Sequence, residues 1–282
     1  MVQISLFLLF NAGVWGLTAL PLILPVLIPS ASHGRTVGNA YAIMEHMLSE
    51  GLAPLFPLAV FLIIGALFGR VLCGWACPFG LVQDLAIMIR RRPARVAVHT
   101  HRSARRFKYY VLGAAMLVSW TLAITVALGV GSRYKEALGY LAAGPFTSLS
   151  PSETLFSLFP MLLIKLSESL DPAAYLSGLP WFFWARIVIL IGVLLLISYV
   201  PRGWCRYLCP VGAFSSLFSR FSLLGLRIDR VKCTRCGECV RACPMMVRIL
   251  DLPAEKIVDP ECIYCLRCLI VCPEGAVKPM FP

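Results

Sequence analysis

Residues 233–244 read C-T-R-C-G-E-C-V-R-A-C-P, and residues 262–273 read C-I-Y-C-L-R-C-L-I-V-C-P. Both stretches share the spacing C-x2-C-x2-C-x3-C-P, which is typical of cysteine-ligated iron–sulfur clusters. A zinc site usually joins two C-x2-C pairs across a longer spacer, and structural disulfides are rare in a reducing cytoplasm. The repeated spacing therefore favours iron–sulfur ligation over zinc or disulfides, and it predicts two [4Fe–4S] clusters.

The two runs also predict which cysteines act together. In ferredoxins with two clusters, the fourth cysteine of each run ligates the cluster of the other run. One predicted ligand set is Cys233, Cys236, Cys239 and Cys272. The second predicted set is Cys262, Cys265, Cys268 and Cys243. We expect both sets in a small α+β domain of the bacterial ferredoxin type that covers residues 226–282.

The rest of the chain has the composition of a membrane protein. The whole sequence is 59% hydrophobic and 14% charged, with a mean hydropathy of +0.80. A membrane-spanning helix needs about 20 apolar residues, and four stretches approach or exceed this length: Ile4–Pro29, Leu55–Leu72, Tyr109–Val130 and Trp181–Val200. The first stretch lacks the basic start and cleavage site of a signal peptide. We therefore expect an all-α membrane domain of four transmembrane helices over residues 1–225.

The distribution of basic residues predicts the orientation in the membrane. The segment Arg90–Lys108 holds eight Lys and Arg residues and no Asp or Glu. Short loops rich in Lys and Arg stay on the cytoplasmic side, so both termini and the iron–sulfur domain are expected on that side of the inner membrane. The net charge of +12 is then explained by topology and by attraction to anionic lipid. No nucleic-acid partner is expected.

An internal repeat links the predicted membrane helices. Residues 70–80 read R-V-L-C-G-W-A-C-P-F-G, and residues 202–212 read R-G-W-C-R-Y-L-C-P-V-G. The shared frame is R-x-x-C-x-x-x-C-P-x-G, and each copy follows the second of two predicted spans. The membrane domain is therefore expected to be a 2+2 repeat of a two-span unit.

The frame contains four more cysteines, which we call the C-x3-C-P cysteines: Cys73, Cys77, Cys205 and Cys209. Residues four apart lie on one face of a helix, and two equivalent units place both pairs near a common axis. Four thiols there suit an additional iron or Fe–S centre. The alternative is that they are buried apolar side chains that fill close helix contacts. The repeated spacing favours a metal centre, and a packing role for these four cysteines stays open.

With these motifs in place, the whole chain resembles ferredoxin-type membrane subunits of the NapH/MauN family. The resemblance rests on the four apolar stretches, both C-x3-C-P motifs and both ferredoxin runs. Such proteins accompany periplasmic nitrate reductase and methylamine utilisation systems. The resemblance implies a quinol dehydrogenase membrane component that relays electrons, with quinone or quinol as a partner and with further Fe–S or cytochrome subunits in a redox complex.

Other cofactors have no support in the sequence. There is no C-x-x-C-H motif for covalent haem, and the histidines His33, His46, His99 and His101 all lie outside the predicted spans. No G-x-G-x-x-G motif is present, so NAD is not expected. The favoured function is electron transfer between the quinone pool and a partner oxidoreductase. Two alternatives are a redox subunit for maturation of a metalloenzyme and a structural Fe–S subunit of a larger complex.

Overall fold

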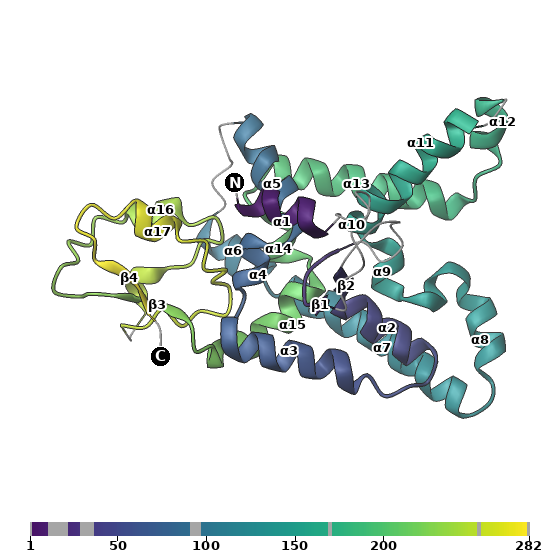
Figure 1. The fold of residues 1–282 in the computed structure, drawn as a ribbon, viewed down its shortest axis with the longest axis horizontal. Coiled ribbons are helices and arrows are strands. Elements are labelled where there is room, and N and C mark those ends of the chain that lie inside the picture. Colours follow the sequence, from purple (N-terminus) through teal and green to yellow (C-terminus); the bar gives the residue numbers. More distant parts are fainter. Residues whose placement is uncertain are drawn as a thin grey trace.

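The chain folds mainly as helices, with a small tail at one end. The computed structural model describes residues 2–10, 22–28, 37–90, 97–168, 171–252 and 255–280. In this part of the chain the strands form two sheets of two strands each. Figure 1 shows the tail, in yellow, beside the helices. The predicted domain boundary between residues 225 and 226 falls inside a strand and stays a prediction.

Among the described residues, two helices are long and apolar enough to cross a membrane. One covers residues 98–127, where α6 (Val98–Ala104) leads into α7 (Phe107–Ala127), and the other is α13 (Trp181–Tyr199). The apolar helix α3 (Leu55–Phe68) has 14 residues. At 1.5 Å per residue it is about 21 Å long, short of a hydrocarbon core of ~30 Å. The arrangement with four spans therefore stays a prediction.

The first predicted span, Ile4–Pro29, is not one continuous helix, and this expectation is corrected. Its start forms α1 (Val2–Phe10), but β1 (Leu22–Leu24) is extended and pairs in parallel with β2 (Val37–Asn39). The residues between α1 and β1 lie outside the described part. Residues 24–28 are buried in the core. An apolar run suits a buried extended segment as well as a membrane helix, and composition does not distinguish the two.

The two copies of the R-x-x-C-x-x-x-C-P-x-G frame pack across one another. In the first copy α3 is followed by α4 (Val71–Trp75) and α5 (Pro78–Arg90). In the second copy α13 is followed by α14 (Gly203–Tyr207) and α15 (Pro210–Phe218). α13 packs against α5, and α15 packs against α3 and α7. Each long helix thus contacts the last helix of the other copy, and the two cysteine-bearing turns meet between them.

The remaining helices complete the helical part. α2 (Ala40–Ser49) packs against α3 and α7. Figure 1 shows α8, α11 and α12 at the end away from the tail. In chain order the further elements are α8 (Gly131–Leu138), η2 (Gly139–Ala143), α9 (Pro145–Leu149), α10 (Pro151–Glu153), η3 (Thr154–Leu158), α11 (Phe159–Glu168) and α12 (Pro172–Ser177).

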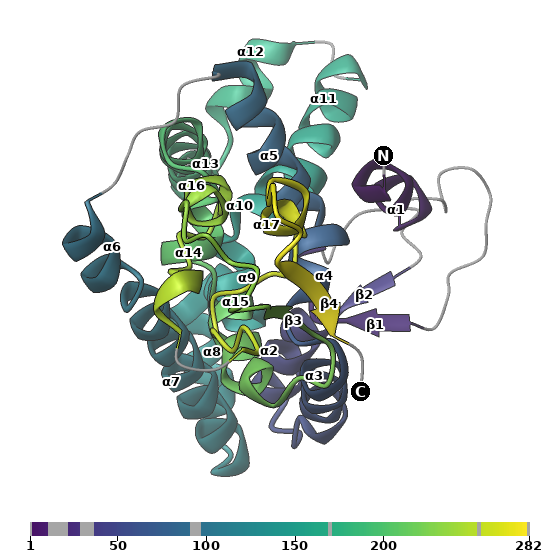
Figure 2. The ribbon, with the colours of Figure 1, turned by 90° about the vertical axis from the view of Figure 1, so that its left-hand side faces the viewer.

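The tail is built on an antiparallel pair of strands, β3 (Gly225–Ile228) and β4 (Val277–Met280). Two short helices, α16 (Glu238–Ala242) and α17 (Arg267–Ile270), begin inside the two cysteine runs and contact each other. The 3-10 turn η4 (Ser219–Phe221) follows α15 at the end of the helical part, and a second 3-10 turn, η5 (Ile249–Asp251), lies within the tail. Figure 2 shows this α+β unit from its own end, in front of α14 and α15.

Candidate metal centres

The tail contains two pockets that are each lined by four cysteines. The one that we call the distal pocket is lined by Cys233, Cys236, Cys239 and Cys272. The one that we call the proximal pocket is lined by Cys243, Cys262, Cys265 and Cys268. Each pocket therefore combines three cysteines of one run with the last cysteine of the other. These are the two sets that the sequence predicts, while cluster binding itself stays a prediction.

The loops around both pockets wrap in the same way. Backbone φ is positive at Arg235, Gly237 and Met246, and again 29 residues later at Tyr264, Leu266 and Gly275. Left-handed residues bend the chain so that consecutive N–H groups can face one centre. Glycine adopts this conformation without steric cost, but the other residues do not. The two runs thus share a strained backbone form that suits a common ligand type.

Backbone N–H groups approach the sulfur of the fourth cysteine in each run. The Val247 N–H donates to Cys243 Sγ over 3.4 Å, and the Ala276 N–H donates to Cys272 Sγ over 3.3 Å. Such bonds favour the thiolate form that binds metal. Burial has the opposite effect and raises the pKa of Cys268 to about 12. A buried thiol therefore keeps its proton in the absence of metal, and binding of a metal displaces that proton.

The four cysteines that line each pocket suit an iron–sulfur cluster. Among the described residues, no three His, Cys, Asp or Glu side chains are placed to hold one metal ion. A [4Fe–4S] cluster is larger than an ion and holds its four thiolates further apart. The all-sulfur donor set also matches the preference of iron–sulfur clusters. Both pockets therefore fit such a group.

The C-x3-C-P cysteines lie together in the core of the helical part. Cys77, Cys205 and Cys209 are buried, and Cys73 is half-buried. Burial raises the pKa of Cys77 to about 12, and the neighbouring Cys205 and Cys73 thiols contribute to this shift. The Cys209 thiol is likewise within electrostatic reach of the other three. The structure thus brings all four side chains into one buried group.

Donors also face the sulfurs of this group. Gly212 N–H donates to Cys209 Sγ over 3.2 Å, and Gln83 Nε2 donates to Cys205 Sγ over 3.1 Å. Backbone groups of Gly80 and Leu27 near the Cys77 thiol partly offset the effect of burial on its pKa. Packing cysteines need no such donors, whereas metal-bound thiolates use them. The surroundings therefore fit a metal centre, and metal binding by these four residues stays a prediction.

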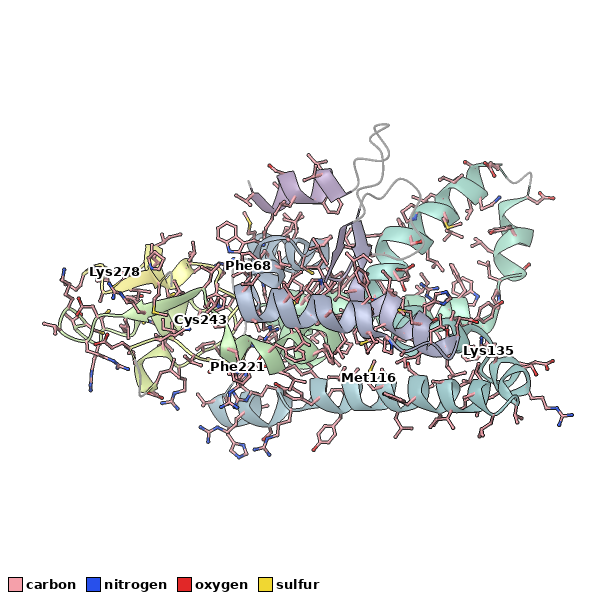
Figure 3. The ribbon with its side chains drawn as sticks, turned by 60° about the horizontal axis from the view of Figure 1, so that its bottom comes forward. Phe68, Met116, Lys135, Phe221, Cys243 and Lys278 are labelled. Carbon is pink, nitrogen blue, oxygen red and sulfur yellow. The ribbon has the colours of Figure 1, made fainter. Side chains whose placement is uncertain are left out.

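The proximal pocket lies directly against the turn that carries Cys73 and Cys77. Trp75 Nε1 donates to the carbonyl of Tyr264 over 2.9 Å. A Cβ on Gly74 would come within 2.5 Å of the Ile263 carbonyl oxygen, so only glycine permits this approach. Figure 3 places Cys243 nearer the helices than Lys278. The two cysteine groups are thus adjacent across a tight contact.

Buried charges fix this contact. Glu261, next to Cys262, accepts from Lys108 at 2.5 Å and from Arg70 at 3.1 Å. The Glu261 carboxyl is buried, which opposes its ionisation, but Arg70 and Lys108 hold its pKa below the usual value. On the neighbouring side Asp84, which pairs with Arg202 within the helical part, also contacts Arg267 of the tail at 3.3 Å. Such charges are costly to bury unless they are paired, so the pairs define one docked position of the tail.

Several of these residues escape sequence reasoning. Gln83, Lys108 and Glu261 follow no metal-binding motif, and each contacts a residue more than 100 positions away in the chain. Arg70 and Arg202 carry a signal, because both open the repeated frame. Their equivalent positions indicate a shared role, but they do not show which residues the two arginines contact.

Comparison with known proteins gives a consistent picture. The model of the 4Fe-4S binding domain matches twice, at residues 50–96 and 182–229, and so covers both copies of the repeated frame. The model of the 4Fe-4S dicluster domain matches residues 225–273. No solved structure matches the chain. Iron–sulfur ligation is thus supported in both the helical part and the tail.

Curated relatives match over most of the chain. An uncharacterized protein of Methanocaldococcus jannaschii is 28% identical over 80% of this chain and 71% of its own length. The ferredoxin-type protein NapH of Haemophilus influenzae is 26% identical over 85% of this chain and 72% of its own length. The methylamine utilization ferredoxin-type protein MauN of Methylobacillus flagellatus is 28% identical over 74% of this chain and 61% of its own length. The expected resemblance is therefore confirmed, and the chain is a relative of the ferredoxin-type proteins NapH and MauN that carries 4Fe-4S binding domains.

Proposed function

We propose that the chain is a membrane-bound electron-transfer subunit that connects the quinone pool with a partner oxidoreductase. The observation that carries this proposal is the direct contact between the C-x3-C-P turn and the proximal pocket, through Trp75 and Tyr264. Bound iron–sulfur groups would supply single-electron acceptance and donation at these places. The names of the relatives NapH and MauN support a role in an electron-transfer system.

The cysteines form three groups that lie in sequence along the molecule. The C-x3-C-P cysteines lie within the helices, which are the part that faces lipid in this proposal. The proximal pocket follows across the Gly74–Ile263 contact, and the distal pocket shares the tail with it. In this arrangement the helical part faces the quinone, and the distal pocket, where Cys236 is exposed, faces the partner oxidoreductase. The protein residues hold the three groups in fixed positions, so no domain movement is required.

Quinol-driven reduction tests this function. We expect that a quinol added anaerobically to the purified full chain reduces its iron–sulfur groups, as followed by loss of visible absorbance and by EPR. The control is dithionite, which reports the total amount of reducible cluster. Full reduction by dithionite with none by quinols of several potentials would contradict the quinone link and favour the maturation or structural alternatives.

The same proposal fixes the orientation in the membrane. Lys108, in the basic segment, contacts Glu261 of the tail, and Gln3 near the N-terminus donates to the Gly74 carbonyl over 2.6 Å. These contacts support a position of both termini on the basic, cytoplasmic side. Reporter fusions at residue 282 should therefore be active only for reporters that work in the cytoplasm. A C-terminus on the outer side would overturn this orientation.

A further inference from the structure

The arginines that open the two repeated frames are both buried and lie beside the opposite copy. Arg202 is 2% exposed, and its Nη1 donates to the carbonyl of Cys73 over 2.8 Å. Arg70 is 1% exposed and lies beside the turn that contains Cys209 and Gly212. Each frame therefore contributes its arginine to the cysteine turn of the other.

The glycine of each frame makes room for this exchange. A Cβ on Gly212 would lie 2.8 Å from Arg70 Nη2, and a Cβ on Gly80 would lie 3.3 Å from Arg202 Nη1. A separation under about 3 Å forces a neighbour to move, and the Arg70 guanidinium is wholly enclosed. The repeated frame thus keeps Arg and Gly as partners across the two copies, not within one copy.

The two arginines differ in how their donors are used. Arg202 is paired with the Asp84 carboxylate and with two backbone carbonyls. Arg70 uses Nη1 for the Pro260 carbonyl and for Glu261, but its Nε and Nη2 have no hydrogen-bond partner among the described residues. An unpaired donor on a buried cation is costly, so two such donors on one guanidinium call for an explanation, and a bound anionic group would supply one. The thiols within electrostatic reach of Arg70 are Cys73, Cys205 and Cys209.

We propose that Arg70 is the positioning and charge-compensating residue of an anionic iron–thiolate centre held by the C-x3-C-P cysteines, toward which it directs its free Nε and Nη2 donors. This inference rests on the proposed function, because it needs a centre at that place. Four thiolates around iron carry net negative charge, and uptake of one electron adds one more negative charge. A fixed cation beside them stabilises the reduced form and raises the reduction potential.

Arg70 would also join this centre to the proximal pocket. Its Nη1 bonds Glu261 and the Pro260 carbonyl, just before Cys262, while its Nη2 lies beside Gly212 in the turn that carries Cys209. If Arg70 only stabilised the fold, the bonds of its Nη1 to Glu261 and Pro260 would be sufficient. The two roles are separable, because Glu261→Gln weakens the ion pair but leaves the free donors of Arg70 in place.

The test is an EPR-monitored redox titration of the full chain, with iron content measured on the same samples. We expect Arg70→Met to lower the reduction equilibrium constant of the C-x3-C-P centre at least tenfold, which is about 59 mV for a one-electron couple. Arg70→Lys keeps the charge and should shift the potential less. Glu261→Gln should leave this centre near its wild-type potential. The signals of the tail clusters report whether each variant is folded.

Arg206→Gln is the matched control, since Arg206 is an equally buried arginine of the second frame. Its Nη1 and Nη2 donors contact Pro201, His101 and Met246, and only its Nε has no partner among the described residues. A wild-type potential in Arg70→Met, with iron retained, would overturn the role of Arg70 while leaving the centre intact. If Arg70→Met does not accumulate, a tenfold or larger change of the same equilibrium constant in Glu261→Gln would overturn it as well. Absence of the centre from the wild-type chain would refute the proposed centre itself, and with it this inference.

Discussion

Replacing Cys243 with serine is expected to remove the cluster of the proximal pocket, although Cys243 belongs to the other cysteine run. The reason is that Cys243 lines the same pocket as Cys262, Cys265 and Cys268. Serine is a poor ligand for iron in a site built for thiolates, and loss of one ligand of four destabilises the whole cluster. Iron bound by the tail should fall from about eight to about four per chain.

Four single variants test the crossed arrangement without any prior assignment of spectra. If the fourth ligands cross, Cys243→Ser and Cys265→Ser lose the same cluster and leave the same residual EPR spectrum. Cys272→Ser and Cys236→Ser should then share a second, different residual spectrum. If the ligands do not cross, Cys243→Ser will instead match Cys236→Ser. Zinc in place of iron in the wild-type protein would contradict both arrangements.

The tail is the part of the structure that the sequence predicts best. Cysteine spacing is local information, and the crossing of fourth ligands follows from the duplication of one motif. Gly237 and Gly275 also mark left-handed positions that can be anticipated. Tyr264 and Leu266 adopt the same conformation without a sequence signal. Their strain is understandable only once the wrapped loop is seen, since residue type argues against it.

The helical part is predicted less well, because composition indicates how apolar a segment is and not which conformation it adopts. The run from Ile4 to Pro29 is apolar enough for a span, yet β1 is a strand and residues 24–28 are buried in the core. The backbone of Leu27 in this segment lies near the Cys77 thiol and partly offsets the effect of burial on its pKa. A segment that lines a site can thus have the composition of a membrane helix.

The sequence also does not predict which distant residues pair with one another. Arg70 and Glu261 are 191 positions apart, and each could equally be a solvated surface charge. The repeated frame draws attention to Arg70 and Arg202, but the exchange of arginines between the two copies depends on the packing of α13 on α5 and of α15 on α3. Spacing therefore identifies the cysteines, whereas only the packed structure identifies the charges around them.

The double variant Cys77→Ser/Cys209→Ser is expected to block reduction by quinol while sparing both tail clusters. The two residues are buried in the helical part, one in each copy of the frame, so the variant removes half of a four-thiolate site. The fold should persist, because a serine at residue 209 can still accept the Gly212 N–H that now bonds Cys209 Sγ. Iron content should drop by the amount of one centre, and dithionite should still reduce the tail.

Cys243→Ser supplies the reciprocal control for this double variant, since it should lose the proximal cluster and keep the centre in the helices. The two variants together distinguish loss of one centre from general unfolding, because each retains the signal that the other lacks. Quinol should reduce the remaining centre in Cys243→Ser but nothing in the double variant. If the double variant keeps both its iron and its quinol-linked reduction, the C-x3-C-P cysteines are packing residues, and quinone must pass its electrons to the tail by a route that avoids them.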